Sequence, residues 1–442
     1  MAVGTALRGV LYILIWAMVA AGCAGPEPVP DTEQGNQELT GHVVTWTTSE
    51  PTLGAVAYRG TDDDIWRVAY PEASLRGDKA YSREHEVPLL SAGEGDSVIV
   101  RLLDRTTEGR LTSSDDFGFL VGERPAWGRV LEWTMIDVGF GDSHLLTMPG
   151  TERRILIDAG ERRDWPNVDE FLKAQAVTRL DAVVATHIHA DHMGGLVGDF
   201  NLATDGVLGV YEVGVFLDSE FKSGERSAYD EVLQILSLRG IPRFLVRTGD
   251  TDDTNDQLAW DPEIQVETLH AGSGFAIGGS SENDRINNDS FVFRITMGEV
   301  NFLLGGDAEG PVEGHLIAEH GNGLEGEVLK VHHHGVNDAT GSGFLARVNP
   351  RVALIPIATF ESNAGTLPSS SVLDRLRSQG TDVYASDRAE PLGIVITGRD
   401  GFHITVTTDG VSYEVLVEPS DSVHYPGGFA PGIGGNPEDD LR

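Results

Sequence analysis

The stretch Thr186-His187-Ile188-His189-Ala190-Asp191-His192-Met193-Gly194-Gly195 directly follows an apolar run, residues 180–185, that is expected to be a buried strand. Side chains that bind ligands often lie where strands end. Two histidines one residue apart can bind one metal ion from a turn, and the Asp191-His192 pair can turn towards a second ion nearby. Four ligand-type side chains within six positions are rare by chance, so this stretch predicts a two-metal site.

Apolar runs and helical periods alternate on both sides of this stretch. Strands are expected at residues 131–136, 144–148, 154–157, 264–269, 291–296, 300–304 and 352–357, helices at 168–177, 228–238, 311–319 and 371–378, and a closing hairpin at 393–398 and 402–407. This alternation is typical of an α/β fold.

The form H-x-H-x-D-H at residues 187–192 is the signature of the metallo-β-lactamase superfamily. Within that superfamily the chain resembles the hydrolase domain of ComEC-type competence proteins, over roughly residues 127–408. The other segments that carry the resemblance, in the family's order, are Asp137-Val138-Gly139-Phe140-Gly141-Asp142-Ser143, Ile155-Leu156-Ile157-Asp158-Ala159-Gly160, Asn288-Asp289-Ser290, Leu303-Leu304-Gly305-Gly306-Asp307-Ala308-Glu309 and Leu329-Lys330-Val331-His332-His333-His334-Gly335. The resemblance implies an αββα sandwich over residues 127–415 and a metal-dependent hydrolase.

The resemblance also implies a set of ligands for two divalent metal ions. The residues implied are His187 and His189 for the first ion, Asp191 and His192 for the second, Asp307 as the bridge between them, and His333 and His334 as candidates for the late ligand to the second ion. Asp191 and Asp307 are the residues expected to serve catalysis. Zinc suits the imidazole-rich set, and manganese or iron fits the added carboxylates nearly as well.

Several positions stay open at this stage. Asp158 is expected to orient a ligand histidine through its second ring nitrogen rather than to bind metal. The third ligand of the first ion is open between His270 and the Asn288-Asp289 pair, and spacing does not settle which of the residues 332–334 binds metal. Phe140 stands where the family usually has Gln, and Leu367-Pro368 where relatives often have His-Pro.

A different pattern precedes the hydrolase region. Residues 41–122 contain short alternating runs at 42–48, 53–58, 82–90 and 97–103, which are broken by Gly, Pro and Asp turns and have no helical period. They predict a small all-β sandwich, and the order of its strands and turns resembles fibronectin type III-like domains.

The two ends of the chain predict export and little fixed structure. Arg8, an apolar run at residues 10–21 and the sequence Ala20-Ala21-Gly22-Cys23 resemble a lipoprotein signal peptide over residues 1–22, with Cys23 as the lipidated residue. Residues 23–40 are expected to be a flexible tether and residues 418–442 a disordered tail. The chain is therefore expected to be a cell-envelope lipoprotein anchored through its lipid, with plain secretion as the alternative.

The charge of the chain bears on its partners. A formal net charge of −37 repels polyphosphates at a distance, which argues against a stable nucleic-acid complex and a processive nuclease. The expected function is a phosphodiesterase or nuclease acting on a small molecule or an oligonucleotide. The alternatives are a lactam or ester hydrolase and a non-catalytic cell-envelope binding protein with a vestigial metal site. The sequence makes no prediction of the oligomeric state.

Overall fold

The computed structural model describes residues 38–62, 65–75, 80–122, 128–198, 204–219, 227–272, 279, 281–357, 367–391, 396–397 and 401–420. The predicted signal peptide, Cys23 and nearly all of the predicted tail lie outside the described residues. Within the described ranges, we find no helix with the length and apolar character that a membrane span requires.

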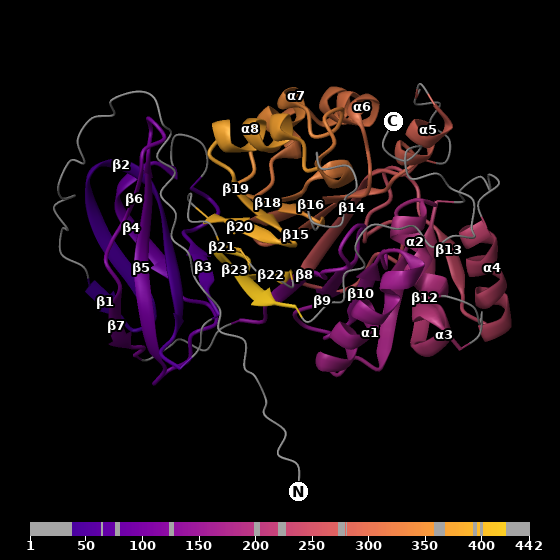
Figure 1. The fold of residues 1–442 in the computed structure, drawn as a ribbon, viewed down its shortest axis with the longest axis horizontal. Helices are drawn as coiled ribbons and strands as arrows, with labels where there is room; N and C mark the ends of the chain where they lie inside the picture. The colour runs from indigo at the N-terminus through magenta and orange to yellow at the C-terminus, as the bar shows by residue number, and fades with distance from the viewer. Residues whose placement is uncertain are drawn as a thin grey trace, which may run out of the picture.

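Two sheets packed face to face form the centre of the hydrolase region, with helices on both outer sides (Figure 1). The strands of the first sheet run in the order β13-β12-β11-β10-β9-β8-β22-β23, and those of the second in the order β14 to β21. Helices α1 to α4 cover the first sheet, and α6 to α8 cover the second (Figure 1). The predicted α/β fold with an αββα sandwich is therefore confirmed.

The first sheet and the helices on its side consist of β8 Leu131–Met135, β9 His144–Thr147, β10 Arg154–Ile157, η2 Arg162–Asp164, α1 Trp165–Ala174, β11 Arg179–Val184, α2 Ala190–Val197, α3 Gly206–Val210, β12 Glu212–Asp218, α4 Ser227–Arg239, β13 Arg243–Leu245, β22 Phe402–Thr408 and β23 Tyr413–Pro419. The second sheet and the helices between and beside its strands consist of β14 Ile264–His270, α5 Glu282–Asn287, β15 Val292–Met297, β16 Val300–Gly305, α6 Gly310–His320, η3 Gly321–Leu324, β17 Val328–Lys330, η4 His332–Gly335, α7 Ser342–Val348, β18 Val352–Ile355, α8 Ser370–Ser378, β19 Asp382–Ala385, β20 Arg388–Glu390 and β21 Ile396–Thr397.

Burial explains why several strands are continuous apolar runs rather than alternating ones. All four residues of β18 are buried, because the facing sheet covers one side and helices cover the other. One core fills the space between the sheets and includes Trp133, Phe293 and Phe302. A second core lies on the side of α6 to α8.

The N-terminal region consists of strands with a core of their own, which includes Trp46, Val87 and Val100. Its strands are β1 Glu38–Thr40, β2 Val43–Gly60, β3 Arg67–Tyr70, β4 Ser82–Pro88, β5 Ser97–Thr106, β6 Leu111–Ser113 and β7 Phe117–Leu120. The two runs expected at residues 42–48 and 53–58 are one strand, β2, whose register against β4 shifts between Thr47 and Thr52. The resemblance to fibronectin type III-like domains stays a prediction.

The N-terminal strands are joined to the hydrolase by a shared sheet. Strand β3 pairs antiparallel with β23, with Val68 opposite Val415, so the first hydrolase sheet continues through β3 into β2, β5 and β6. Tyr58 also donates a 2.6 Å hydrogen bond to the buried carboxylate of Glu414. The N-terminal strands and the hydrolase are therefore in direct contact through the β3–β23 pairing.

Strands extend into both of the ranges expected to lack fixed structure. Strand β1 lies inside the range expected as a tether, where it pairs with β2, and β23 runs past residue 415 and into the range expected as a tail. The closing hairpin is wrong, because β21 pairs with β20 in the second sheet while β22 forms a hairpin with β23 in the first. Strand pairing uses backbone groups, which a polar sequence supplies as well as an apolar one.

Candidate metal centre

The H-x-H-x-D-H stretch crosses from the end of β11 into the first turn of α2. His187 and His189 lie in the turn between the two elements, and Asp191 and His192 lie on α2. Close packing holds this turn, because a Cβ at Gly195 would lie 2.0 Å from the carbonyl oxygen of Ala159. The glycine that ends the stretch therefore lets α2 pack against the loop that follows β10.

Ligand-type atoms gather here in two groups that share one residue. Asp142, His192, Asp307 and His334 each offer one atom, and these atoms lie within 4.8 Å of one another. His187, His189 and Asp307 form a second such group. All six side chains are buried, so the structure brings together residues from four separate segments of the chain around Asp307.

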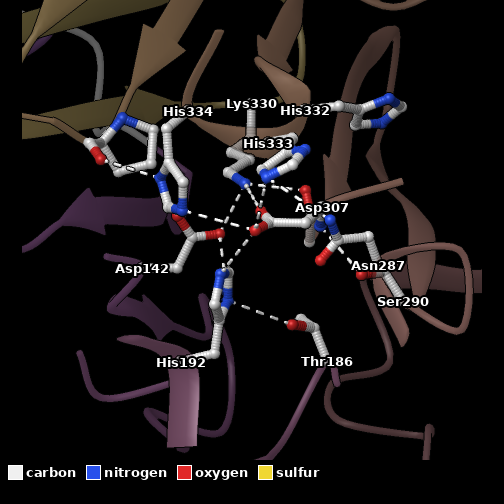
Figure 2. Close-up of polar contacts among 12 residues, drawn as sticks. Asp142, Thr186, His192, Asn287, Ser290, Asp307, Lys330, His332, His333 and His334 are labelled. Atoms are coloured by element: carbon white, nitrogen blue, oxygen red, sulfur yellow. Dashed lines mark hydrogen bonds and ion pairs between the residues drawn. The ribbon is translucent and has the colours of Figure 1, made fainter. Parts of the chain in front are cut away.

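One oxygen of Asp307 is the meeting point of the histidines (Figure 2). Its Oδ2 lies 3.1 Å from Nε2 of His192, 3.4 Å from Nε2 of His334 and 3.8 Å from Nε2 of His187. The other oxygen, Oδ1, lies 3.5 Å from the ammonium of Lys330. The backbone N–H of Asp307 donates to Ser290 Oγ at 2.8 Å, which fixes the carboxylate after strand β16.

Asp191 and Asp142 lie on opposite sides of the same two imidazole rings. Asp191 Oδ2 faces their Nε2 atoms, at 3.2 Å from His334 and 3.8 Å from His192. Asp142 instead faces their Nδ1 atoms, at 3.4 Å and 3.7 Å, and pairs with Lys330 Nζ at 2.6 Å. Asp191 therefore faces the same Nε2 atoms as Asp307 does, although Asp142 and not Asp191 belongs to the four-residue group.

Asp158 contacts the second ring nitrogen of His192. Its Oδ2 lies 2.8 Å from His192 Nδ1, and its two oxygens also accept hydrogen bonds from the backbone N–H and hydroxyl of Thr186. A hydrogen bond at Nδ1 fixes the ring so that Nε2 points at Asp307. Nε2 of His192 is buried and makes no hydrogen bond, which is the state expected of an atom that binds metal.

The three consecutive histidines point in different directions (Figure 2). His332 turns away, with Nδ1 3.0 Å from Glu313 on α6. His334 turns inward, and its Nδ1 donates to the carbonyl oxygen of Pro356 at 3.1 Å. His333 and His334 have φ values of 47° and 49°. Two such residues in the left-handed region are costly, and strain of this kind is common at functional sites.

Six of the sequence-derived candidates are not part of the two groups: Asp158, Asp191, His270, Asn288, Asp289 and His333. His270 faces the carbonyl oxygen of Asn288 at 2.9 Å, and the Asn288 amide contacts Glu309. Asp289 joins neither group among the described residues, and His333 Nε2 is 3.9 Å from Asp307 Oδ2 without belonging to either. The third ligand of the first ion therefore stays open, since neither His270 nor Asp289 lies in the group of His187, His189 and Asp307.

Sequence reasoning missed the roles of Asp142 and Lys330. Both lie in segments that carry the family resemblance, at residues 137–143 and 329–335, and Lys330 is one of only four lysines in the chain. A lone lysine between apolar residues, as in Leu329-Lys330-Val331, is a signal of a buried ion pair.

Carboxylates dominate the electrostatics of the cluster. Burial by itself disfavours charged imidazole, yet Asp307 and its neighbours raise the pKa of His334 to about 9 and hold that of His192 well above its usual value. Burial, together with His192 and His189, holds the pKa of His187 well below its usual value. The carboxylates of the cluster therefore stabilise positive charge, which divalent cations can supply in place of protons.

Comparison with known proteins agrees with this geometry. The family model described as "Metallo-beta-lactamase superfamily" matches residues 136–358. The chain belongs to the metallo-beta-lactamase superfamily. Proteins of this superfamily are typically metal-dependent hydrolases, and the buried His/Asp cluster that could bind metal ions confirms the prediction of such an enzyme.

Relatives from this superfamily include competence proteins. The chain is 27% identical over 289 residues to ComE operon protein 3 of Bacillus subtilis (strain 168), covering 61% of this chain and 34% of that protein. It is 26% identical over 271 residues to Competence protein ComA of Neisseria gonorrhoeae, covering 61% and 32%. The chain therefore spans about a third of the length of these relatives.

Solved structures of the superfamily are more distant. A metallo-beta-lactamase from Cronobacter sakazakii, in a mutant form, is 15% identical, with a TM-score of 0.24 over 41% of this chain and 63% of that one. This likeness is too low to bear on the site.

Proposed function

We propose that the chain is an exported, dinuclear metal-dependent phosphoesterase, acting as a phosphodiesterase or nuclease on a small molecule or an oligonucleotide. The observation that carries the proposal is the position of Asp307 Oδ2, which lies within 3.8 Å of histidines from both ligand groups. A carboxylate in this position can bridge two cations.

The donor set fits two divalent ions. The residues that would hold the first are His187, His189 and Asp307, and those for the second include His192, Asp307 and His334. Asp191 lies outside that group, and we propose it as a further ligand of the second ion because its Oδ2 lies 3.2 Å from Nε2 of His334. Imidazole nitrogens with carboxylate oxygens suit zinc best, and manganese or iron nearly as well. Divalent ions held this close would supply Lewis-acid chemistry, activating water near neutral pH and neutralising charge that develops on phosphoryl oxygens.

The surrounding residues set the geometry for that chemistry. Asp158 fixes the ring of His192, and the Pro356 carbonyl fixes that of His334, so both rings present Nε2 to the same space. Lys330 contacts Oδ1 of Asp307, so Oδ2 of Asp307 is available to bind metal. Positioning of this kind lowers the barrier because little reorganisation remains for the reaction itself.

The side from which substrate enters is marked by exposure. The side chains of Asp191 and His333 are 11% and 10% exposed, whereas those of His187, His192 and His334 are 0–1% exposed. A substrate would therefore approach between Asp191 and His333. The likeness to competence proteins favours a phosphoester over a lactam as that substrate.

One set of assays tests the proposal. Purified protein should contain about two divalent ions per chain and hydrolyse bis(p-nitrophenyl) phosphate and single-stranded DNA, but not a chromogenic cephalosporin. Turnover of the cephalosporin alone would support the lactam hydrolase instead. Protein with fewer than about one ion and no turnover would support the non-catalytic alternative.

Export and lipid attachment are the second part of the proposal. The support is the single cysteine of the chain, Cys23, directly after an apolar run that a signal peptide requires. In cells that process lipoproteins, the chain should take up radiolabelled palmitate and sediment with membranes. The variant Cys23→Ser should do neither, and equal labelling of the variant would contradict the anchor.

A further inference from the structure

A third group of ligand-type side chains lies beside the two that share Asp307. Glu309, His333 and Asp338 each offer one atom, and these three atoms lie within 4.8 Å of one another. None of the three belongs to the other two groups. Glu309 follows Asp307 by two residues, and His333 directly precedes His334, so the third group is built on the same two loops as the metal centre.

The ring of His333 lies between Asp307 of the metal centre and Glu309 of the third group. Its Nε2 faces Asp307 Oδ2 at 3.9 Å, and its Nδ1 faces Glu309 Oε1 at 3.5 Å. The side chain is only 10% exposed, and Nδ1 is buried and makes no hydrogen bond. A buried ring nitrogen without a hydrogen bond is costly, which makes it an observation that calls for a ligand.

Glu309 is fixed in place rather than free to turn into solvent. Its Oε1 accepts a 2.9 Å hydrogen bond from the Asn287 amide and its Oε2 a 3.3 Å bond from that of Asn288, while its backbone N–H donates to Asn288 Oδ1 at 3.1 Å. Each carboxylate oxygen keeps a further lone pair for a cation. Asn288, a candidate ligand from the sequence, thus orients a carboxylate instead.

We propose that Glu309, His333 and Asp338 form a third divalent-cation site on the open side of the metal centre. Two carboxylates and one imidazole suit a hard ion such as Mn²⁺. Asp338 is exposed, whereas Glu309 is 5% exposed. A site with one exposed ligand should bind its ion more weakly than the buried centre and exchange it with solvent.

The site would select for substrates with more than one phosphate, a step that rests on the proposed phosphoesterase function. A chain with a net charge of −37 repels a polyanion as it approaches. A cation held by His333, beside the carboxylate of Asp307, would pair with a phosphate next to the one being hydrolysed. The third ion should therefore favour an oligonucleotide over an isolated phosphodiester.

Electron paramagnetic resonance of Mn²⁺ tests the site in the full-length chain. The chain is first loaded with Zn²⁺, which gives no signal, and is then titrated with Mn²⁺. We expect one bound Mn²⁺ per Zn²⁺-loaded chain, and Asp338→Asn should weaken that binding at least tenfold. The control is Asp253→Asn, which removes the same charge from another exposed acid and should bind Mn²⁺ as the wild type does.

Two results would overturn the site: no Mn²⁺ bound to the Zn²⁺-loaded wild type, or equal affinity in Asp338→Asn. Neither result touches the dinuclear centre, whose failure would appear earlier, as a chain that does not hold Zn²⁺. For the substrate role, added Mn²⁺ should lower KM for a thymidine oligonucleotide several-fold in the wild type and not in Asp338→Asn. An unchanged KM in both would overturn that role.

Discussion

Lys330 shows how one residue balances the charge of the centre. Its ammonium is fully buried, with Asp142 Oδ2 at 2.6 Å, the Gly306 carbonyl at 2.8 Å and Asp307 Oδ1 at 3.5 Å. Burial would lower the pKa of this lysine, but the carboxylates, Asp142 first, outweigh burial and raise it. Burial would likewise raise the pKa of Asp142, and Lys330 outweighs it and lowers that pKa. Both groups are therefore charged at neutral pH.

A double-mutant cycle tests this pair. Lys330→Met leaves the Asp142 carboxylate buried without its partner, so we expect the free energy of unfolding to fall by about 3–5 kcal/mol. Adding Asp142→Asn removes the unpaired charge, and the double variant should lose less than the sum of the two single variants. Urea unfolding in the presence of a chelator measures all four proteins. Strictly additive losses would contradict the direct pairing.

How much of the site the sequence predicts depends on how close its residues are along the chain. His187, His189, Asp191 and His192 are recognisable because the four ligands lie within one turn and the start of one helix. Asp142 and Glu309 lie in separate loops and Lys330 ends strand β17, so no spacing relates them before the sheets are assembled. The direction of each residue in 332–334 was equally hidden, because it depends on left-handed backbone values rather than on residue type.

The backbone of η4 points neighbouring histidines in different directions, so His334 and His332 have different expected roles. His334→Ala should lower the metal content by about one ion per chain, since its Nε2 faces Asp307 and Asp191. His332→Gln should keep the wild-type metal content, because its ring faces Glu313, and Gln can donate to that carboxylate as well. Metal analysis of the two purified variants is the measurement. An equal loss of metal in both variants would contradict the placement of the His332 ring against Glu313, away from the metal centre.

Another element-scale feature is a buried histidine in the N-terminal strands. His85 on β4 stacks on Trp46 with ring centroids 4.6 Å apart, and its Nε2 lies 2.9 Å from the hydroxyl of Thr52. Burial, helped by the charge of Arg351, lowers its pKa from 6.5 to about 4. The folded chain therefore keeps this ring neutral under conditions in which the unfolded chain protonates it.

The pH dependence of stability follows from that shift. Between pH 6.5 and about 4 the unfolded state binds a proton that the folded state does not. The stability is thus fully present above pH 6.5 and declines as the pH falls towards 4, by up to about 3 kcal/mol. Urea unfolding of the wild type and His85→Gln between pH 4 and 7 should show a shallower decline in the variant. Parallel curves would contradict a neutral His85.

Predictions from the sequence were weakest where elements meet. The apolar strands of the hydrolase were predictable because both faces are buried, as in β18. The pairing of β3 with β23 was not, because 340-odd residues of chain separate Val68 from Val415 and each strand is compatible with several neighbours. The same holds for β22, whose partner is β23 rather than the run at residues 393–398.

At the scale of the whole molecule, the shared sheet couples the N-terminal strands to the hydrolase. Besides the β3–β23 pairing, the Tyr70 hydroxyl lies 2.9 Å from Asp382 and 2.8 Å from the hydroxyl of Tyr384 in the second sheet. The buried Glu414 carboxylate accepts bonds from Tyr58 and from the backbone N–H of Leu90. Removing the N-terminal strands would remove these hydrogen bonds from Asp382, Tyr384 and Glu414.

Cooperative unfolding is the expected consequence. Scanning calorimetry of the full chain should show a single transition, because neither region can unfold without exposing the sheet edge and the polar groups of the other. Two well-separated transitions would mean that the N-terminal strands form an independent domain. The matched measurement is the same scan of Tyr70→Phe, which should lower the midpoint and keep one transition.

Asp307 is proposed to join two cation sites into one catalytic centre. The most direct measurement is the turnover of bis(p-nitrophenyl) phosphate by metal-free protein as Zn²⁺ is added, for the wild type and for Asp307→Ala. The wild type should gain its full rate at about two equivalents of Zn²⁺, and Asp307→Ala should stay inactive with little loss of secondary structure. Full activity at one equivalent, or wild-type turnover in Asp307→Ala, would contradict the bridging role.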